Sequence, residues 1–127
     1  DAVHFAGAVN QETLAEYMTA ADILCLASSR EGWPNVVHEA LACGAPVIAT
    51  DVGGVPDMLP EACYGRVITT GPAERLRDEL TQSLDEALRQ NWDRQAIANW
   101  GRVRTWRAVA EEAAHCLVKA ARQKGAI

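Results

Sequence analysis

Apolar residues along the chain fall into two patterns, short continuous runs and helical spacings. Short, mainly apolar runs occupy residues 3–6, 23–28, 46–50 and 65–69. The run at 23–28 is uninterrupted, as expected of a strand that is covered on both faces of a parallel sheet. The pattern therefore predicts four strands, the first of them at residues 3–6.

Between these runs, apolar residues recur every three or four positions, which is typical of amphipathic helices. This spacing predicts helices over residues 14–21, 34–44 and 72–88. A long amphipathic helix is predicted over residues 106–120. Residues 89–104 are rich in Trp, Arg and Asn and are interpreted as an irregular connection.

Strand and helix thus alternate from one end of the chain to the other, with connections of only a few residues. That order predicts an α/β fold with a mainly parallel sheet, flanking helices and a long C-terminal helix. The length of 127 residues, with no repeat or linker, predicts a single domain over residues 1–127. Because the chain opens directly on a predicted strand, we interpret it as a piece of a longer protein.

Composition narrows the function classes. The net charge of −5 argues against a nucleic-acid partner, and no apolar run is long enough to span a membrane. The four cysteines are widely separated, lie among apolar neighbours and form no CxxC pair. This pattern favours buried free thiols in a reducing compartment over zinc or disulfides, and so a cytoplasmic protein without a metal site.

Glycine, proline and charged residues gather in the segments that follow each predicted strand. Because the carboxyl ends of parallel strands meet at one edge of the sheet, these loops should share a rim, where ligands bind in such folds. Ordinary turn formation is the alternative for each loop taken alone. The density of such residues in "SREGWPNVVHE", residues 29–39, favours a binding cleft.

Within that segment, the residue types predict contacts to an anionic ligand. Glu31 precedes the helix and projects at the rim, and Gly32 allows close approach to the backbone. The free N–H groups of residues 35–37 would point out of the helix N-terminus toward an anion such as phosphate. Glu39 should be partly buried at the flank of the apolar stripe and need a partner, such as the two hydroxyls of a ribose.

Two other interpretations of the glutamates stay open from the residues alone. A lone glutamate on a helix is usually solvated. Two carboxylates can also act as the acid and nucleophile of a glycosidase, although spacing in the sequence does not fix their separation. One carboxylate at the rim and one beside an anion-binding helix end suit a nucleoside diphosphate better. His38 is interpreted as a solvated residue on the far side of the helix.

The residues also match a known family. Glu31 and Glu39 form an E-x7-E motif within "EGWPNVVHEALACGAPVIATDVGG", which resembles the signature of retaining, GT-B-fold glycosyltransferases of group 1. The segments "VHFAGAV", "YMTAADILCLASS" and "GRVITTGPAERL" resemble the same family in order and spacing. The likeness covers residues 3–89 well and thins through the tail.

The resemblance implies a Rossmann-like domain that binds a UDP- or GDP-sugar and transfers the sugar with retention of configuration. Glu39 would hold the ribose hydroxyls and Glu31 would lie against the donor sugar, which makes these two the implied catalytic residues. The implied donor-binding residues further comprise Gly7, Ala8 and Val9 near the nucleobase, Gly32, Trp33, Pro34, Asn35 and Val36 along the sugar and diphosphate, and Gly53 and Gly54 at the edge of the cleft. Asp57 stands where many relatives have Glu and receives no role.

The family likeness also implies what lies outside this sequence. Relatives neutralise the diphosphate with an Arg and a Lys from an upstream segment, and they bind the acceptor with an N-terminal domain. The chain is thus expected to be part of a C-terminal donor-binding domain, whose partners are its parent's N-terminal domain and a sugar, lipid-linked or polysaccharide acceptor. Neither cofactor nor metal is expected, and the parent protein could lie at the inner membrane surface. Alternatives are a sugar-nucleotide epimerase of the same fold and a non-catalytic nucleotide-binding or interaction module.

Overall fold

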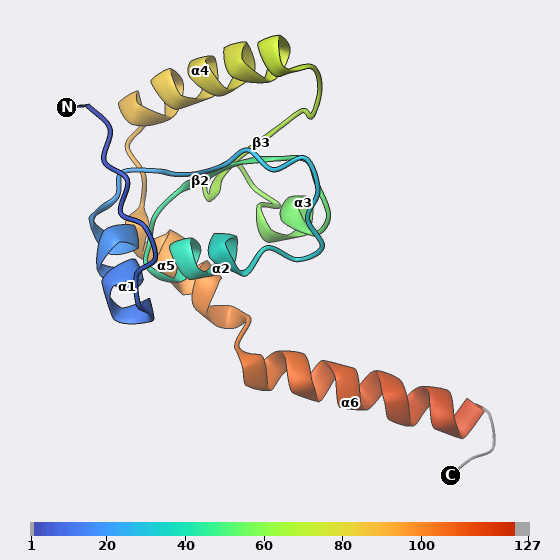
Figure 1. The fold of residues 1–127 in the computed structure, drawn as a ribbon. Coiled ribbons are helices and arrows are strands. Elements are labelled where there is room, and N and C mark those ends of the chain that lie inside the picture. The colour runs from blue at the N-terminus through green and yellow to red at the C-terminus, as the bar shows by residue number, and fades with distance from the viewer. Residues whose placement is uncertain (1, 124–127) are drawn as a thin grey trace.

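The computed structural model describes residues 2–123, and three parallel strands form its sheet (Figure 1). The strands are β1 (Leu24–Leu26), β2 (Val47–Thr50) and β3 (Gly65–Ile68), in the order β1-β2-β3. Leu24 lies opposite Val47, and Val47 lies opposite Gly65. The predicted parallel sheet is therefore confirmed for the last three of the four predicted strands.

Six helices are described around this sheet. They are α1 (Gln11–Ala20), α2 (Asn35–Ala42), α3 (Val55–Met58), α4 (Ala73–Arg89), α5 (Arg94–Val103) and α6 (Trp106–Gln123). In Figure 1, α4 lies on one side of the sheet, and α1, α2 and α5 lie on the other. The predicted α/β architecture with flanking helices and a long C-terminal helix is confirmed.

The alternation of side chains along β2 explains the two layers. Val47 and Ala49 are fully buried on one face, in a cluster with residues of α1, α2, α3 and α5. Ile48 points to the other face, where it packs with Ile68 of β3 and Ala87 of α4. Since successive residues of a strand point to opposite faces, an all-apolar strand needs helices on both sides. The run at β2 has them.

Helix α2 begins and ends close to where its sequence predicts. Pro34 occupies the N-cap position, and Val37, Ala40 and Leu41 are fully buried against the sheet. The chain leaves the helix through Gly44, whose φ of +79° is readily adopted only by glycine. A Cβ at Gly44 would also lie 2.7 Å from the carbonyl oxygen of Arg94.

The strand predicted at residues 3–6 is not present. Residues 2–9 carry no regular hydrogen bonding, and Val3 and Phe5 are 67% and 91% exposed. An apolar run forms a strand only where a neighbouring strand completes its hydrogen-bond ladder. Within the described residues, no strand pairs with this segment.

Residues 89–104 were predicted to be irregular, and this prediction is wrong. Asp93 caps α5 by accepting a hydrogen bond from the backbone N–H of Ala96 at 2.9 Å. Ile97 is fully buried, and Gly101 lies so close to α2 that a Cβ there would be 2.3 Å from the backbone nitrogen of Ala42. Helix α5 therefore packs tightly on α2 through its Gly101 position.

The last helix differs from the others in its surroundings. In Figure 1, α6 projects away from the rest of the molecule, and none of its described residues is buried. Trp106 and Leu117 are 78% and 71% exposed. The predicted helix is thus confirmed, while several of its large apolar side chains stay exposed among residues 2–123. Over the same residues, no helix has the length and apolar character that crossing a membrane requires.

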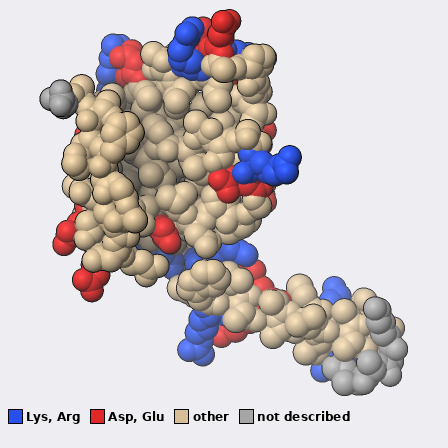
Figure 2. All heavy atoms as spheres, in the orientation of Figure 1, with Lys and Arg blue, Asp and Glu red and all other residues tan. Residues whose placement is uncertain are grey.

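Charged side chains lie at the surface, mostly beside an opposite charge. Figure 2 shows basic and acidic groups next to one another along α4, where Arg89 pairs with Asp85 at 2.8 Å. Such exposed pairs contribute at most about 1 kcal/mol each, so the apolar layers hold the fold. The cysteines are free, as predicted, but Cys25, Cys63 and Cys116 are exposed. Their predicted burial is wrong, because they lie on an edge strand, a loop and the projecting helix.

Candidate functional site

The loop that carries Glu31 is anchored to the carboxyl end of the sheet. Thr50, fully buried at the end of β2, donates its hydroxyl hydrogen to the carbonyl oxygen of Ser28 at 2.5 Å. The Ser28 hydroxyl in turn donates to the Glu31 carboxylate at 2.7 Å. Glu31 is half-buried and is thus oriented by a neighbour that is itself tied to the sheet.

The Gly53–Gly54 turn lies against this loop. The backbone N–H of Gly54 donates to the carbonyl oxygen of Gly32 at 2.8 Å. A Cβ at Gly53 would lie 2.3 Å from that same oxygen and 2.4 Å from the carbonyl oxygen of Glu31, and its φ is +53°. Only glycine fits such a close approach of two backbones. The loops that follow β1 and β2 are therefore in contact, as their common rim predicts.

Trp33 fills the space beside the turn. A Cβ at Gly54 would be 2.1 Å from Cε3 of the Trp33 ring, so the indole packs directly on that glycine. The ring centroid lies 5.6 Å from that of His38, and the guanidinium carbon of Arg104 lies 4.8 Å from it. The indole is still 40% exposed. It joins the Glu31 loop to α2 and to the connection before α6.

The N-terminus of α2 offers fewer free donors than predicted. The N–H of Val37 donates to the carbonyl oxygen of Pro34 at 3.1 Å, which removes it from the three predicted anion-binding groups. Asn35 and Val36 begin the helix immediately after the Glu31 loop. Their N–H groups retain the orientation along the helix axis that favours an anion.

Glu39 lies on the outer face of α2 and is exposed, so the prediction that it is partly buried is wrong. Because Val37, Ala40 and Leu41 take the core-facing positions, the helical repeat turns position 39 away from the sheet. There it lines an open groove of about 670 Å³ between α2, α5 and the start of α6. We call this the α2–α6 groove; its lining residues are Trp33, Asn35, His38, Glu39, Ala42, Gly101, Arg102, Arg104, Thr105, Trp106 and Val109.

His38 is not the solvated residue that the sequence predicts. Both ring nitrogens are buried and have no hydrogen-bond partner among the described residues. Burial lowers the pKa of His38 from its ordinary value of 6.5, and the positive charge of Arg104 lowers it further. Trp33 and Arg104, which cover the groove side of α2, account for this, and no feature of the local sequence reveals it.

The implied donor-binding residues are brought together only in part. Trp33, Asn35 and Glu39 line the α2–α6 groove, whereas Glu31 and Gly32 lie with the Gly53–Gly54 turn at the adjoining loops. Residues 7–9 are exposed ahead of α1 and do not line the groove. The arginines of the groove, Arg102 and Arg104, were missed because their segment was interpreted as irregular.

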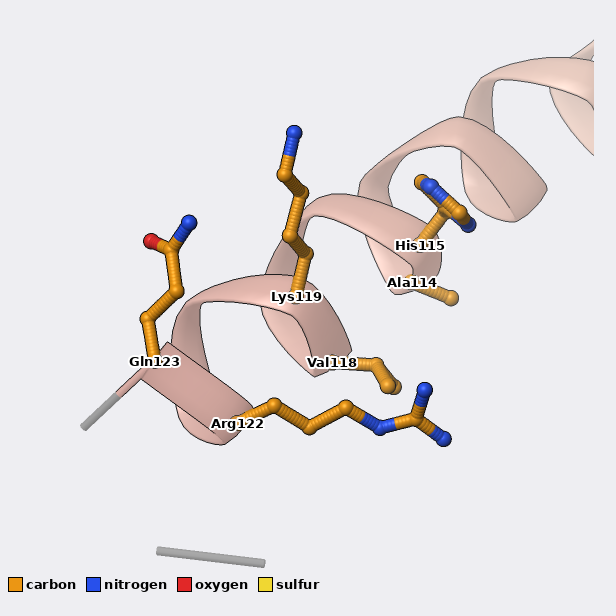
Figure 3. Close-up of a pocket in the computed structure, with 6 residues that line it drawn as sticks. All are labelled: Ala114, His115, Val118, Lys119, Arg122 and Gln123. Atoms are coloured by element: carbon orange, nitrogen blue, oxygen red, sulfur yellow. The ribbon is translucent and has the colours of Figure 1, made fainter. Parts of the chain in front are cut away.

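A second hollow, of about 480 Å³, lies along α6. Figure 3 shows that its lining side chains, among them His115, Lys119 and Arg122, all come from that one helix and point in different directions. No other element among residues 2–123 faces this hollow, so its side chains do not enclose a binding site. Within the same residues, no group of three or more His, Cys, Asp or Glu side chains could hold a metal ion.

Known proteins share this fold and sequence. Sucrose-phosphate synthase from Thermosynechococcus elongatus superposes with a TM-score of 0.66 at 30% identity, over 92% of this chain and 30% of that one. The likeness agrees with the predicted Rossmann-like sheet of a GT-B glycosyltransferase.

Curated relatives agree in class. N-acetyl-alpha-D-glucosaminyl L-malate synthase from Bacillus anthracis is 35% identical over 97 residues, which is 76% of this chain and 25% of the relative. D-inositol 3-phosphate glycosyltransferase from Streptomyces bingchenggensis is 32% identical over 112 residues, 77% of this chain and 25% of the relative. The chain thus spans about a quarter of the length of these relatives.

The family model described as glycosyl transferases group 1 matches residues 1–99. This range contains the Glu31 loop, the Gly53–Gly54 turn and all of α2. The chain therefore belongs to the group 1 glycosyl transferases.

Proposed function

We propose that this chain is the donor-binding part of a retaining glycosyltransferase that moves a sugar from a nucleoside diphosphate to an acceptor. The observation that supports it most is the meeting of three features at one edge of the sheet. These are the Ser28-oriented carboxylate of Glu31, the Gly53–Gly54 turn bonded to Gly32, and the N-terminus of α2. Each suits a different part of a nucleotide sugar.

The diphosphate is assigned to the N-terminus of α2. The N–H groups of Asn35 and Val36 and the helix dipole favour its negative charge. Gly32 leaves the approach open, since a Cβ built there would meet no atom within 4 Å. The absence of a side chain at this position lets the phosphates or sugar reach the backbone.

The ribose is assigned to Glu39 and the donor sugar to Glu31. Glu39 is exposed at the α2–α6 groove, so its carboxylate is available to accept from two neighbouring hydroxyls. Glu31 stands on the loop side, at the end of β1. The nucleobase is assigned to residues 7–9, following the family likeness.

Catalysis in this proposal comes from positioning and charge stabilisation. The departing diphosphate takes the proton of the acceptor hydroxyl while the anomeric configuration is retained. Glu31 lies beside the reacting sugar and favours the positive charge that develops there. No metal and no further cofactor take part.

The remaining parts of the enzyme are assigned to a parent protein in the cytoplasm. Residues 1–127 would form part of its C-terminal domain, and the N-terminal domain would bind a sugar, lipid-linked or polysaccharide acceptor. The exposed apolar side chains of α6 support a partner domain, because Trp106 and Leu117 have no cover among the described residues.

The experiment is a donor panel on the purified full-length protein. UDP-glucose, UDP-N-acetylglucosamine and GDP-mannose are titrated by calorimetry, and sugar release or transfer is followed by chromatography. We expect one donor to bind and its anomeric configuration to be retained. Binding of no nucleotide sugar, or binding without release or transfer, would leave a non-catalytic module or an epimerase instead. The 127-residue chain alone should transfer no sugar, and transfer by it would overturn the assignment of acceptor binding to another domain.

A further inference from the structure

Arg104 connects the start of α6 to the loop that carries Glu31. It lies in the short segment between α5 and α6, and its guanidinium carbon is 4.8 Å from the centroid of the Trp33 ring. One of its terminal nitrogens pairs with the carboxylate of Glu112 at 3.3 Å. A cation over an indole face is an attractive contact, and the pair with Glu112 fixes the direction from which it acts.

Trp33 links that contact to the loop because one side of its ring packs on the Gly53–Gly54 turn. Its indole packs on Gly54, where a Cβ would be 2.1 Å from the ring. It stands between Gly32, whose carbonyl oxygen accepts from Gly54 at 2.8 Å, and Pro34, whose φ is −71°. A ring that leaves Gly54 would give up its contact with the turn that is hydrogen-bonded to the Glu31 loop.

Packing alone leaves this ring incompletely held. The indole is 40% exposed, and Arg104, which lies over the ring, belongs to the connection before α6, a helix with no buried residue. We propose that Arg104 is a positioning residue for Glu31 that acts by holding the Trp33 indole against Gly54. This inference rests on the function proposed above, because it gives Glu31 its task. It assigns the connection before α6 a part in setting the reacting geometry.

The first test measures the loop without any substrate. Hydrogen–deuterium exchange is followed in the full-length protein for peptides over residues 28–35 and 47–50. Arg104→Ala should speed exchange in residues 28–35 by about three- to thirtyfold and leave residues 47–50 unchanged, and Arg104→Lys should restore part of the protection. The control is Arg107→Ala, because Arg107 is 88% exposed, pairs with Glu111 on the same helix and does not line the α2–α6 groove.

The second test is a double-mutant cycle with Glu31→Gln. Arg104→Ala should lower kcat on the order of fivefold in the native background, with unchanged affinity for the bare nucleoside diphosphate. In the Glu31→Gln background the same substitution should change kcat by less than about twofold, because the group that it positions is already altered. Arg107→Ala should leave kcat unchanged.

The outcomes separate this inference from the proposed function. A native protein that neither binds nor transfers any sugar would refute the proposed function, and exchange in residues 28–35 would still decide whether Arg104 holds the loop. Equal losses of kcat in both backgrounds, or equal exchange in Arg104→Ala and Arg107→Ala, would overturn the positioning role. Arg104 also lines the α2–α6 groove, so loss of diphosphate affinity along with kcat would show that it contacts the ligand directly, and this would overturn the positioning role.

Discussion

The backbone N–H of Gly54 donates a hydrogen bond to the carbonyl oxygen of Gly32 at 2.8 Å. This bond joins the loop after β1 to the loop after β2, so the Glu31 segment and the Gly53–Gly54 turn form one structural unit. The unit depends on missing side chains, since a Cβ at Gly53 or Gly54 would run into Gly32 or Trp33. A substitution in either loop should therefore change the structure of the other.

Gly54→Ala should displace Trp33 and destabilise the domain. Its added Cβ would lie 2.1 Å from the indole, which is far inside van der Waals contact. Overpacking of this kind costs about 1–3 kcal/mol in the free energy of unfolding. Urea unfolding of the full-length protein measures the loss. A second substitution, Trp33→Ala, should relieve the clash, and equal stability of Gly54→Ala and native protein would contradict this packing.

Gly32→Ala should have the opposite profile. A Cβ at Gly32 meets no atom within 4 Å, so the free energy of unfolding should change by less than about 0.5 kcal/mol. The same methyl group would occupy the open approach to the loop, and the affinity for the donor should fall. Calorimetric titration beside urea unfolding makes the comparison. If Gly32→Ala binds the donor with native affinity, the donor does not lie against Gly32.

Gly101→Ala tests the packing of α5 on α2. A Cβ there would lie 2.3 Å from the backbone nitrogen of Ala42 and 2.4 Å from the carbonyl carbon of Leu41. Backbone atoms cannot yield as a flexible side chain can, so we expect a loss of about 3 kcal/mol or more in the free energy of unfolding. The control is Gly71→Ala, whose nearest neighbour would be 3.8 Å away. Equal unfolding midpoints for the two variants would contradict the close helix contact.

His38 should make the stability depend on pH. Its pKa in the folded protein lies below the ordinary value of 6.5, because burial and then Arg104 disfavour the charged form. Below about pH 6.5 the unfolded chain binds a proton that the folded chain does not, so the free energy of unfolding falls as the pH falls. His38→Gln should flatten this dependence in urea unfolding. His115→Asn, at an exposed position on α6, is the control and should leave it unchanged.

Much of the fold follows from patterns that local residues carry. The apolar runs at β1, β2 and β3 and the stripe of α2 predict their elements, because burial on one or both faces leaves a periodic signal. Residues 3–6 carry the same signal without a strand, since a ladder also needs a partner. The cap at Asp93 and the buried Ile97 are signals of α5 that the sequence contains, but its Trp, Arg and Asn residues were interpreted as an irregular connection.

The candidate site was predicted less completely, because parts of it depend on contacts between distant segments. The E-x7-E spacing points to the Glu31 loop and to α2, which follows it directly. It does not reveal that Glu39 is exposed or that the ring nitrogens of His38 are buried. The cation above Trp33 comes from Arg104, far along the chain, and only the folded structure brings them together.

The proposed function gives Glu31 and Glu39 different roles, one in the chemical step and one in binding. Loss of an interaction that is made mainly in the transition state lowers kcat and kcat/KM together, whereas loss of one that is made equally with bound substrate raises KM alone. In the proposed function, Glu31 at the sugar makes an interaction of the first kind and Glu39 at the ribose one of the second. Glu31→Ala should therefore lower kcat strongly in steady-state assays.

Calorimetric titration of the full-length protein with the bare nucleoside diphosphate tests this claim most directly. Hydrogen bonds to charged groups are worth about 1.5–3 kcal/mol. Glu39→Gln should therefore lower the affinity for the nucleoside diphosphate by roughly ten- to a hundredfold. Glu31→Ala should leave that affinity within about twofold of native, and Glu74→Gln, at an exposed position on α4, serves as the control. Native affinity in Glu39→Gln, or equal losses in both glutamate variants, would contradict the proposed placement of the donor.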